Sequence, residues 1–440
     1  MRKVAFITLG CKVNQYETNA MTQEFIKNDY KVVEHDEVAD IYIVNTCTVT
    51  NMSDRKSRQM LRKVKEENPH AIIIACGCYA QVAKSELEKI EEIDIVLGNS
   101  EKKKIVEYTK EFIKNRNKEI HIEDVMYNKE YIEFGDVTYT EKTRAVIKVQ
   151  DGCDRFCSYC IIPYARGRVR SRKPESVISE IEKIAKEGIK EVVITGIHVA
   201  SYGKDFKEDY KLIDLLEEIN KINGIKRIRL GSIEPLLITE EFVERLKKLE
   251  KICHHFHLSL QSGCDETLKR MNRRYTTEQF RTIVKRLREA YNDVILTTDI
   301  IVGFPEETDE EFNKTYEFLK EINFYKMHVF KYSQRKGTKA AAMKKQIDGN
   351  IKEKRSKALI QLSNENEKKY NENYIGKIVE VLFEEKKDDL YQGHTQNYIL
   401  VKCKTDNDIS EKICKVKCKR IEKGYIIAEL LQCNENVMLM

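Results

Sequence analysis

The sequence has 440 residues, of which 41% are hydrophobic and 34% are charged, and its formal net charge at pH 7 is +6. The chain is too long for one ordinary core, so about three domains of ~150 residues each are expected. This composition is ordinary for a soluble enzyme with a solvated surface. The mild positive charge permits a polyanionic partner but does not demand one.

The chain contains thirteen cysteines, and their role depends on the compartment. No run of about 18 apolar residues could span a membrane. Residues 1–10 predict a short strand and turn, with no apolar signal-peptide core after them. We therefore expect a cytoplasmic protein that does not contact a membrane. In a reducing cytoplasm, cysteines serve as metal ligands or buried thiols rather than as disulfides.

Residues 1–115 alternate short apolar runs with helical patterns, which predicts an N-terminal parallel α/β domain. A capping box formed by Asn14 and Glu17 is predicted to start the first helix, and Ser53 is predicted to cap the second. A third helix is expected over about 81–90. The apolar runs that predict strands are 4–9, 41–45, 71–75 and 93–97.

Three cysteines follow the first three of these runs: Cys11, Cys47 and Cys78. Because the carboxyl ends of parallel strands meet at one sheet edge, where ligands bind, these distant thiols are expected to converge. The alternative is three unrelated buried cysteines, since free cysteine is commonly buried. Cys76 competes with Cys78, but Cys11 and Cys78 each follow a glycine at the same offset from their strands. Cys78 is therefore the predicted ligand, and Cys76 is predicted to be a packed thiol.

The predicted second helix carries a cationic face. Arg55, Arg58 and Arg62 recur at helical spacing together with Lys65, and no acidic residue interrupts the run. Such a run is usually only a solvated face. Because it begins shortly after Cys47, contact with RNA phosphate groups is the second interpretation.

Residues 139–370 predict a partial (β/α)6 barrel, reached through a polar connection over 101–139. A complete barrel needs eight strands, so one side should stay open, which suits a large substrate such as folded RNA. Active sites of such barrels lie at the carboxyl ends of the strands. The strand candidates are 144–149, 191–195, 227–232, 255–261, 294–302 and 326–332.

A cysteine triplet follows the first barrel strand as C-x3-C-x2-C: Cys153, Cys157 and Cys160, with Tyr159 before the last. Three thiolates on one loop can ligate three irons of a [4Fe–4S] cube and leave the fourth iron open. The alternative is structural zinc, which favours four closed ligands in two separated pairs. The triplet resembles that of the radical S-adenosylmethionine (SAM) superfamily, in which the open iron binds SAM.

Within that superfamily, the sequence around the N-terminal cysteines resembles the methylthiotransferases. The resemblance implies that Cys11, Cys47 and Cys78 ligate a second [4Fe–4S] cluster. The sequence Cys-Lys-Val-Asn-Gln at 11–15 is most similar to that of the branch that acts on N6-threonylcarbamoyladenosine next to the tRNA anticodon. The matching stretches are 8–17, 44–50 and 77–81, and the resemblance extends over nearly the whole chain.

Polar residues follow the barrel strands, and the resemblance implies that residues at such positions surround SAM. After the second strand the chain has Thr195-Gly196-Ile197-His198, where many superfamily members have Gly-Gly-Glu to hold the SAM amine. The candidate SAM-binding residues are Tyr159, Gly196, Ser232, Glu234, Gln261 and Asp299.

Two basic stretches flank the expected barrel mouth, at 164–173 and 269–274. The first contains Arg166 and Arg168 among five cations without an anion. Cations beside a catalytic mouth fit a nucleic-acid substrate, because they neutralise phosphate groups.

Residues 372–440 change to short strands with glycine turns, which predicts a small β-barrel. The stretches 375–382 and 393–398 resemble the TRAM domain, a tRNA-binding module. Lys417 and Arg420 lie in its one cationic ridge. The strand candidates are 378–383, 398–402, 414–419 and 425–430, and the cysteines expected to be buried or incidental are Cys403, Cys414, Cys418 and Cys433.

The resemblance implies a tRNA methylthiotransferase with two [4Fe–4S] clusters. It would use SAM to place a methylthio group on C2 of N6-threonylcarbamoyladenosine. An external flavodoxin or ferredoxin-type protein would supply electrons. The alternatives are methylthiolation of isopentenyladenosine in tRNA, methylthiolation of a ribosomal protein by a related branch, and a non-enzymatic RNA-binding metalloprotein.

Overall fold

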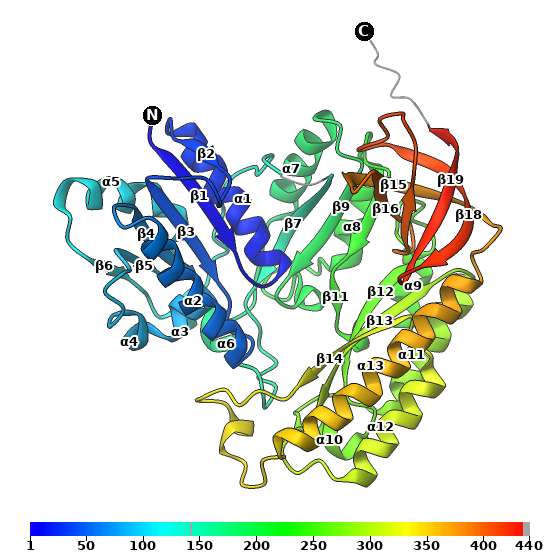
Figure 1. Ribbon diagram of the computed structural model, residues 1–440. Helices are drawn as coiled ribbons and strands as arrows, with labels where there is room; N and C mark the ends of the chain where they lie inside the picture. The colour runs from blue at the N-terminus through cyan, green and yellow to red at the C-terminus, as the bar shows by residue number, and fades with distance from the viewer. Residues whose placement is uncertain (141–142, 434–440) are drawn as a thin grey trace.

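The computed structural model describes residues 1–140 and 143–433 (Figure 1). A six-stranded sheet comes first, two curved four-stranded sheets follow, and a closed barrel ends the described chain. This confirms the predicted fold class. Residues 141–142 and 434–440, which fall in the predicted central and C-terminal domains, lie outside the described residues.

The N-terminal sheet is parallel throughout, in the order β2-β1-β3-β4-β5-β6. Helices cover both faces, which is why its central strands are continuous apolar runs. Helices α1 and α5 pack on one face and α2, α3 and α4 on the other. The elements are β1 Lys3–Thr8, α1 Lys12–Lys27, β2 Lys31–Val33, β3 Ile41–Thr46, α2 Asn51–Glu67, β4 Ile72–Gly77, α3 Cys78–Val82, α4 Lys84–Leu87, β5 Ile95–Leu97, η1 Glu101–Lys104, α5 Ile105–Asn115 and β6 Glu119–His121.

Four local predictions for this region are wrong. Asn14 does not cap α1, which begins at Lys12; its amide instead donates to the carbonyl oxygens of Leu9 and Thr46. The hydroxyl of Thr50, rather than Ser53, caps α2. The helix expected over 81–90 is split into α3 and α4, and the connection expected over 101–139 contains α5 and the edge strand β6.

The central strands curve into a partial barrel, as predicted. The chain passes from one four-stranded sheet to the other at Gly231, between β10 and β11. Alternate strand residues such as Ile194 and Leu258 pack outward against the surrounding helices. The residues that alternate with them along each strand, including Arg229 and His257, therefore face the concave side. A 3-10 turn, η2 Val125–Tyr127, precedes these strands. The strands are β7 Arg144–Asp151, β8 Arg170–Ser171, β9 Glu191–Gly196, β10 Arg227–Leu230, β11 Ser232–Ile233, β12 His255–Gln261, β13 Ile295–Val302 and β14 Lys326–Lys331.

Helices surround the outside of these strands (Figure 1). The long helix α13 packs beside β14 and leads toward the C-terminal barrel. The helices and 3-10 turns are α6 Ile162–Arg166, α7 Pro174–Lys186, η3 Val199–Ser201, α8 Leu212–Lys221, η4 Pro235–Leu237, α9 Glu240–Leu246, α10 Asp265–Arg270, α11 Thr277–Ala290, α12 Asp309–Ile322, η5 Lys339–Ala342 and α13 Gly349–Glu372.

The C-terminal strands close into a small barrel in the order β15-β16-β17-β19-β18. Its apolar core includes Phe383, Val401 and Val416. Across the β18–β19 pair, Cys414 and Cys433 are register partners with adjacent sulfur atoms, and Cys414 is buried as expected. The strands are β15 Ile378–Lys387, β16 Leu390–Thr395, β17 Leu400–Cys403, β18 Ile413–Glu422 and β19 Tyr425–Cys433.

In the described parts of the chain, no helix has both the length and the apolar character needed to cross a membrane.

We predict that Gly393→Ala destabilises the C-terminal barrel by about 1–3 kcal/mol, the usual cost of overpacking. A Cβ at Gly393 would lie 2.1 Å from the backbone oxygen of Leu382 on the paired strand. Gly349→Ala is the matched control, because nothing lies within 4 Å of its added Cβ. Hydrogen exchange of β15 and β16 amides should accelerate only in Gly393→Ala. Equal exchange in both variants would contradict this reading of the strand pair.

Candidate functional site

The N-terminal cysteines converge as predicted. Cys11, Cys47 and Cys78 follow β1, β3 and β4, which are neighbours in the sheet. A Cβ added to Gly10 would lie 2.8 Å from the Sγ of Cys47, so the loops that carry Cys11 and Cys47 touch. Burial raises the pKa of Cys47 to about 11, and the charges of Cys78 and Cys11 contribute. Metal binding at this edge would therefore have to displace thiol protons at neutral pH.

The second triplet lies on a short loop after β7, at the carboxyl end of the barrel. The backbone N–H of Cys153 donates to the oxygen of Gly167 at 3.0 Å, and that of Cys160 donates to Cys157 at 2.9 Å. Phe156 has a φ of 49°, in the left-handed region, which turns the loop sharply. Burial raises the pKa of Cys153 to about 11 and that of Cys160 to about 12.

Cysteines from both triplets line one cavity of about 640 Å³. Cys11 and Cys47 line one side and Cys160 lines the other, together with Tyr159. The lining also includes Gln261, Asp299, Phe330 of β14 and Tyr332 just after that strand. The cavity therefore lies between the N-terminal sheet and the barrel mouth.

The loop after β14 fastens this cavity to the N-terminal sheet. Arg335 pairs with Asp54 at 2.7 Å and donates to the hydroxyl of Thr48 at 2.6 Å. Ser333 accepts from the backbone N–H of Asn51 at 3.0 Å. These contacts bring the barrel loop against the residues that follow Cys47.

The remaining candidate SAM-binding residues do not line this cavity. Gly196 packs against Gln150, and Ser232 is exposed. Glu234 is buried and accepts from Arg273 at 2.9 Å. Arg273 also donates to the Sγ of Cys157 at 3.5 Å, so Glu234 reaches the cysteine loop through this arginine.

Sequence reasoning missed a buried charge cluster between the N-terminal sheet and the barrel. Glu17 of α1 accepts hydrogen bonds from Lys102, Lys148 and Arg166, and its side chain is 2% exposed. Burial alone would raise the pKa of Glu17, but these three cations hold it well below its usual value. Asp151 pairs with Lys148 at 2.6 Å. No sequence signal marked this cluster, because Lys102 lies in a run of lysines that is typical of an exposed surface.

Arg166 was predicted to contact RNA, and the structure contradicts that prediction. Its side chain is 0% exposed and held by Glu17 and Asp151. Burial would lower the pKa of Arg166, but Cys78, Glu17 and Asp151 raise it well above its usual value. Most of the basic stretch 164–173 is therefore buried in ion pairs. Of the two arginines in it that were predicted to contact RNA, Arg168 is the exposed one.

The other predicted RNA contacts lie on the surface. Arg55 and Arg62 are exposed on α2, and Lys417 and Arg420 are exposed on β18. Arg58 is half-buried and donates to the hydroxyl of Tyr79 at 2.6 Å and to the carboxylate of Glu86 at 3.2 Å. Arg58 is thus less available for phosphate than its neighbours on the same helix. The other exposed candidate, Arg168, has its guanidinium 4.9 Å from the ring centre of Phe156 in the triplet loop.

The donor set suits an iron–sulfur cluster. Each triplet offers three free thiols, the ligands that such clusters take. Over residues 1–140 and 143–433, no three Cys, His, Asp or Glu side chains are gathered closely enough to hold a single metal ion. The two triplets are therefore not closed around one ion in this structure, as a structural zinc site would be.

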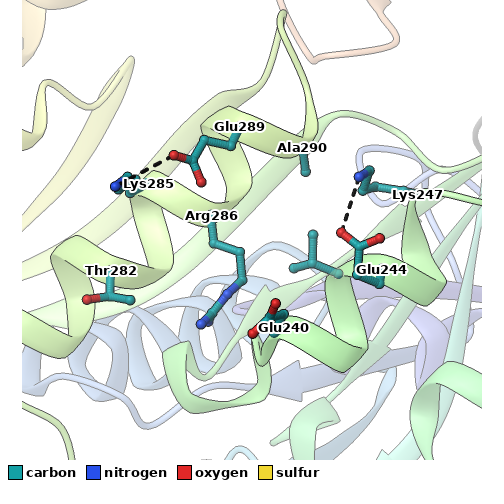
Figure 2. Close-up of a pocket in the computed structure, with 9 residues that line it drawn as sticks. Glu240, Glu244, Lys247, Thr282, Lys285, Arg286, Glu289 and Ala290 are labelled. Atoms are coloured by element: carbon teal, nitrogen blue, oxygen red, sulfur yellow. Dashed lines mark hydrogen bonds and ion pairs between the residues drawn. The ribbon is translucent and has the colours of Figure 1, made fainter.

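A separate hollow of about 330 Å³ lies on the outer surface between α9 and α11 (Figure 2). Its charges compensate one another: Glu244 pairs with Lys247 at 3.2 Å, and Lys285 pairs with Glu289 at 3.7 Å. Arg286 donates to a backbone carbonyl. The lining contains neither a thiol nor an aromatic ring, so this hollow is not the candidate site.

Comparison with known proteins agrees with this geometry. Residues 147–319 match the radical SAM superfamily, and residues 3–98 match a family described as uncharacterized protein family UPF0004. The chain is 43% identical over 97% of its length, and 95% of the relative's, to threonylcarbamoyladenosine tRNA methylthiotransferase MtaB of Bacillus subtilis. It is 42% identical, over 91% of this chain and 96% of the relative, to the Aquifex aeolicus protein of that name. It is 35% identical, over 97% of this chain and 92% of the relative, to tRNA-2-methylthio-N(6)-dimethylallyladenosine synthase of Caldicellulosiruptor saccharolyticus.

Solved structures show the same fold at low sequence identity. The radical S-adenosylmethionine methyltransferase TsrM from Kitasatospora setae superposes with a TM-score of 0.55 at 16% identity, covering 75% of this chain and 73% of that one. The cobalamin-dependent S-adenosylmethionine radical enzyme OxsB superposes with a TM-score of 0.51 at 14% identity, covering 85% of this chain and 56% of that one. These likenesses concern the fold alone.

We predict that Cys78→Ala roughly halves the iron content of anaerobically reconstituted protein, from about eight to about four atoms per chain. Cys76→Ala should keep about eight. The reason is position: Cys76 is fully buried inside β4, and burial raises its pKa to about 12, whereas Cys78 begins α3 beyond the strand end. Iron and sulfide analysis of both variants is the measurement. Loss of iron in Cys76→Ala with retention in Cys78→Ala would reverse the assignment.

Proposed function

The chain belongs to the tRNA methylthiotransferases of the radical SAM superfamily, and on this premise we propose that it methylthiolates C2 of N6-threonylcarbamoyladenosine in tRNA. The more similar relatives carry the name of the threonylcarbamoyladenosine enzyme. The dimethylallyladenosine synthases match less closely. This difference supports the threonylcarbamoyl nucleoside over the isopentenyl one.

The observation that carries the proposal is the shared cavity. Cys11 and Cys47 approach it from the N-terminal sheet, and Cys160 approaches it from the barrel. A methylthio transfer needs two chemistries at one adenine: removal of a hydrogen atom and delivery of sulfur. A single chamber reached by both thiol sets allows one bound nucleoside to meet both without leaving the protein.

Two [4Fe–4S] clusters and SAM are the cofactors of this proposal. Cys153, Cys157 and Cys160 would hold the cluster that binds SAM, and Cys11, Cys47 and Cys78 would hold the other. When bound, these groups supply the radical chemistry at C2 and the sulfur that is transferred. The chain itself contributes positions, charges and the exclusion of water.

Residues of the lining and of the loop beside it suit particular roles in this proposal. The rings of Tyr159, Phe330 and Tyr332 supply apolar surface to the lining. Asp299 and Gln261 supply polar groups on the same lining, suited to the polar parts of SAM or the nucleoside. The guanidinium of Arg273 lies beside the Cys157 sulfur and would offset the negative charge of a cluster there.

The surface of the chain supports a tRNA partner. Arg55 and Arg62 are exposed on α2, which begins close to Cys47, and Arg168 lies at the triplet loop. Lys417 and Arg420 add exposed cations on the C-terminal barrel. Phosphate contacts of this kind supply affinity without reading the sequence. A flavodoxin or ferredoxin-type protein in the cytoplasm would provide the electrons.

Nucleoside mass spectrometry tests the substrate. A strain without this protein should accumulate tRNA N6-threonylcarbamoyladenosine that lacks the methylthio group, and the wild-type chain should restore the modification. Unchanged modification of this nucleoside, with loss of methylthio-isopentenyladenosine, would assign the chain to the alternative tRNA substrate. Loss of a modified ribosomal protein with unchanged tRNA would contradict a tRNA substrate altogether.

Alanine substitutions in the two cysteine triplets should also have different effects on the reaction products. Cys153→Ala, Cys157→Ala and Cys160→Ala should each abolish 5′-deoxyadenosine formation, because this loop lies at the barrel mouth where SAM would bind. Cys11→Ala and Cys47→Ala should still form 5′-deoxyadenosine but no methylthio product, since these thiols belong to the other sheet. Chromatography of both products from one dithionite-reduced reaction measures this. Loss of SAM cleavage in the second group, with the barrel cluster spectroscopically intact, would contradict the division.

A further inference from the structure

Arg166 joins the two halves of the site. It ends α6, shortly after Cys160, and therefore belongs to the barrel. Its Nε donates to the Sγ of Cys78 at 3.2 Å, across the interface with the N-terminal sheet. The side chain is 0% exposed, so no water competes for this contact. Arg166 of the barrel thus contacts a cysteine sulfur of the N-terminal sheet.

The same guanidinium also organises the other two N-terminal cysteine loops. One terminal nitrogen donates to the amide oxygen of Asn14 at 2.7 Å. The amide nitrogen of Asn14 in turn donates to the carbonyl oxygens of Leu9 and Thr46, at 2.7 and 3.0 Å. These carbonyls lie just before Gly10-Cys11 and immediately before Cys47. Arg166 therefore contacts one thiol directly and the loops of the other two through one amide.

The charges around Arg166 do not cancel. The buried carboxylates of Glu17 and Asp151 face four cations, Lys102, Lys148, Arg166 and Arg170, in contacts of at most 3.8 Å. Four cations against two carboxylates leave an excess of two positive charges in a region without solvent. Buried charge of one sign is costly unless it is paired. The remaining donor of Arg166 points at Cys78, so negative charge on the sulfurs of this triplet would provide the balance.

We propose that Arg166 is a positioning residue that holds the N-terminal cluster in place and raises its reduction potential from the barrel side. The inference rests on the proposed function, because it assumes that Cys78 is a cluster ligand. A hydrogen bond and a positive charge next to a ligating sulfur favour the reduced state, which carries one more negative charge. Docking of the barrel onto the N-terminal sheet is therefore part of what sets the electronic properties of the second cluster.

The test uses the full chain with Cys153, Cys157 and Cys160 replaced by alanine, so that the N-terminal cluster is the one that remains. Arg166→Gln removes the charge in this background, and Arg166→Lys keeps it while losing the forked donors. Arg172→Gln is the matched control. Arg172 is also 0% exposed and also bridges the interface, to Glu180 and Tyr16, but it contacts no thiol in the described residues.

Redox titration followed by electron paramagnetic resonance gives the midpoint potential of the cluster. In Arg166→Gln the reduction equilibrium should shift about tenfold toward the oxidised cluster, a decrease of about 59 mV for one electron. Arg166→Lys should shift it less, and Arg172→Gln should leave it unchanged even if its thermal stability falls. An unshifted potential in Arg166→Gln, or an equal shift in Arg172→Gln, would overturn the inference.

Cluster loss is also informative. If both Arg166 variants lose iron while Arg172→Gln retains it, the positioning role is supported, because the two arginines are equally buried in the same interface. If Arg172→Gln loses iron to the same extent, the effect belongs to the interface in general, and the inference is overturned. Failure of the parent triple variant to hold any iron would contradict the proposed ligands Cys11, Cys47 and Cys78 themselves, and with them this inference. These outcomes separate the inference from the function on which it rests.

Discussion

The interface between the N-terminal sheet and the barrel depends on the buried carboxylate of Glu17. Three cations from two parts of the chain share it: Lys102 from the sheet side, and Lys148 and Arg166 from the barrel. Removing the carboxylate of Glu17 would leave these buried cations without their shared partner, which typically costs about 3–5 kcal/mol. The geometry is therefore strongly specified: the two parts can dock in the register that pairs these charges, and other registers would leave them unpaired.

That register determines where the chemistry can happen. The loops after β1 and β3 lie opposite the loop after β7, so Cys11 and Cys47 of one triplet share a cavity with Cys160 of the other. The contacts of Arg335 with Asp54 and Thr48 close the same interface from the far side of the barrel. Ion pairs on two sides of the cavity thus fix the separation of the triplets, which a transfer between two sites requires.

The sequence was sufficient for the features that arise from local pattern. Apolar runs and their periodicity located the barrel strands within a few residues, and the strand-then-cysteine placement predicted the convergence of Cys11 and Cys47 correctly. Prediction from the sequence failed where the burial of a side chain depends on a partner distant in the chain. Asn14 and Glu17 have the spacing of a capping box, but their side chains instead bind residues of other elements. Local spacing carries no information about which face of a helix another domain will cover.

Charged residues show the same limit. The lysine run containing Lys102 and the arginine-rich stretch containing Arg166 both have the composition of an exposed basic surface, yet both side chains are 0% exposed. What distinguishes them is a buried carboxylate supplied by α1, which no feature within either run reveals. Arg168, two positions further along the chain, remains exposed, so even adjacent members of one run differ in role.

The position of the C-terminal barrel constrains how an RNA can bind. Its residues contact the amino-terminal ends of the central strands: Arg227 donates to the oxygen of His394 in β16, and Asn397 donates to the oxygen of Asp293, just before β13. The cysteine triplet follows the opposite end of β7, which spans eight residues. At about 3.3 Å per residue, these ends are separated by roughly 26 Å. A tRNA that contacts both the C-terminal barrel and the cavity would therefore have to span the length of the central strands.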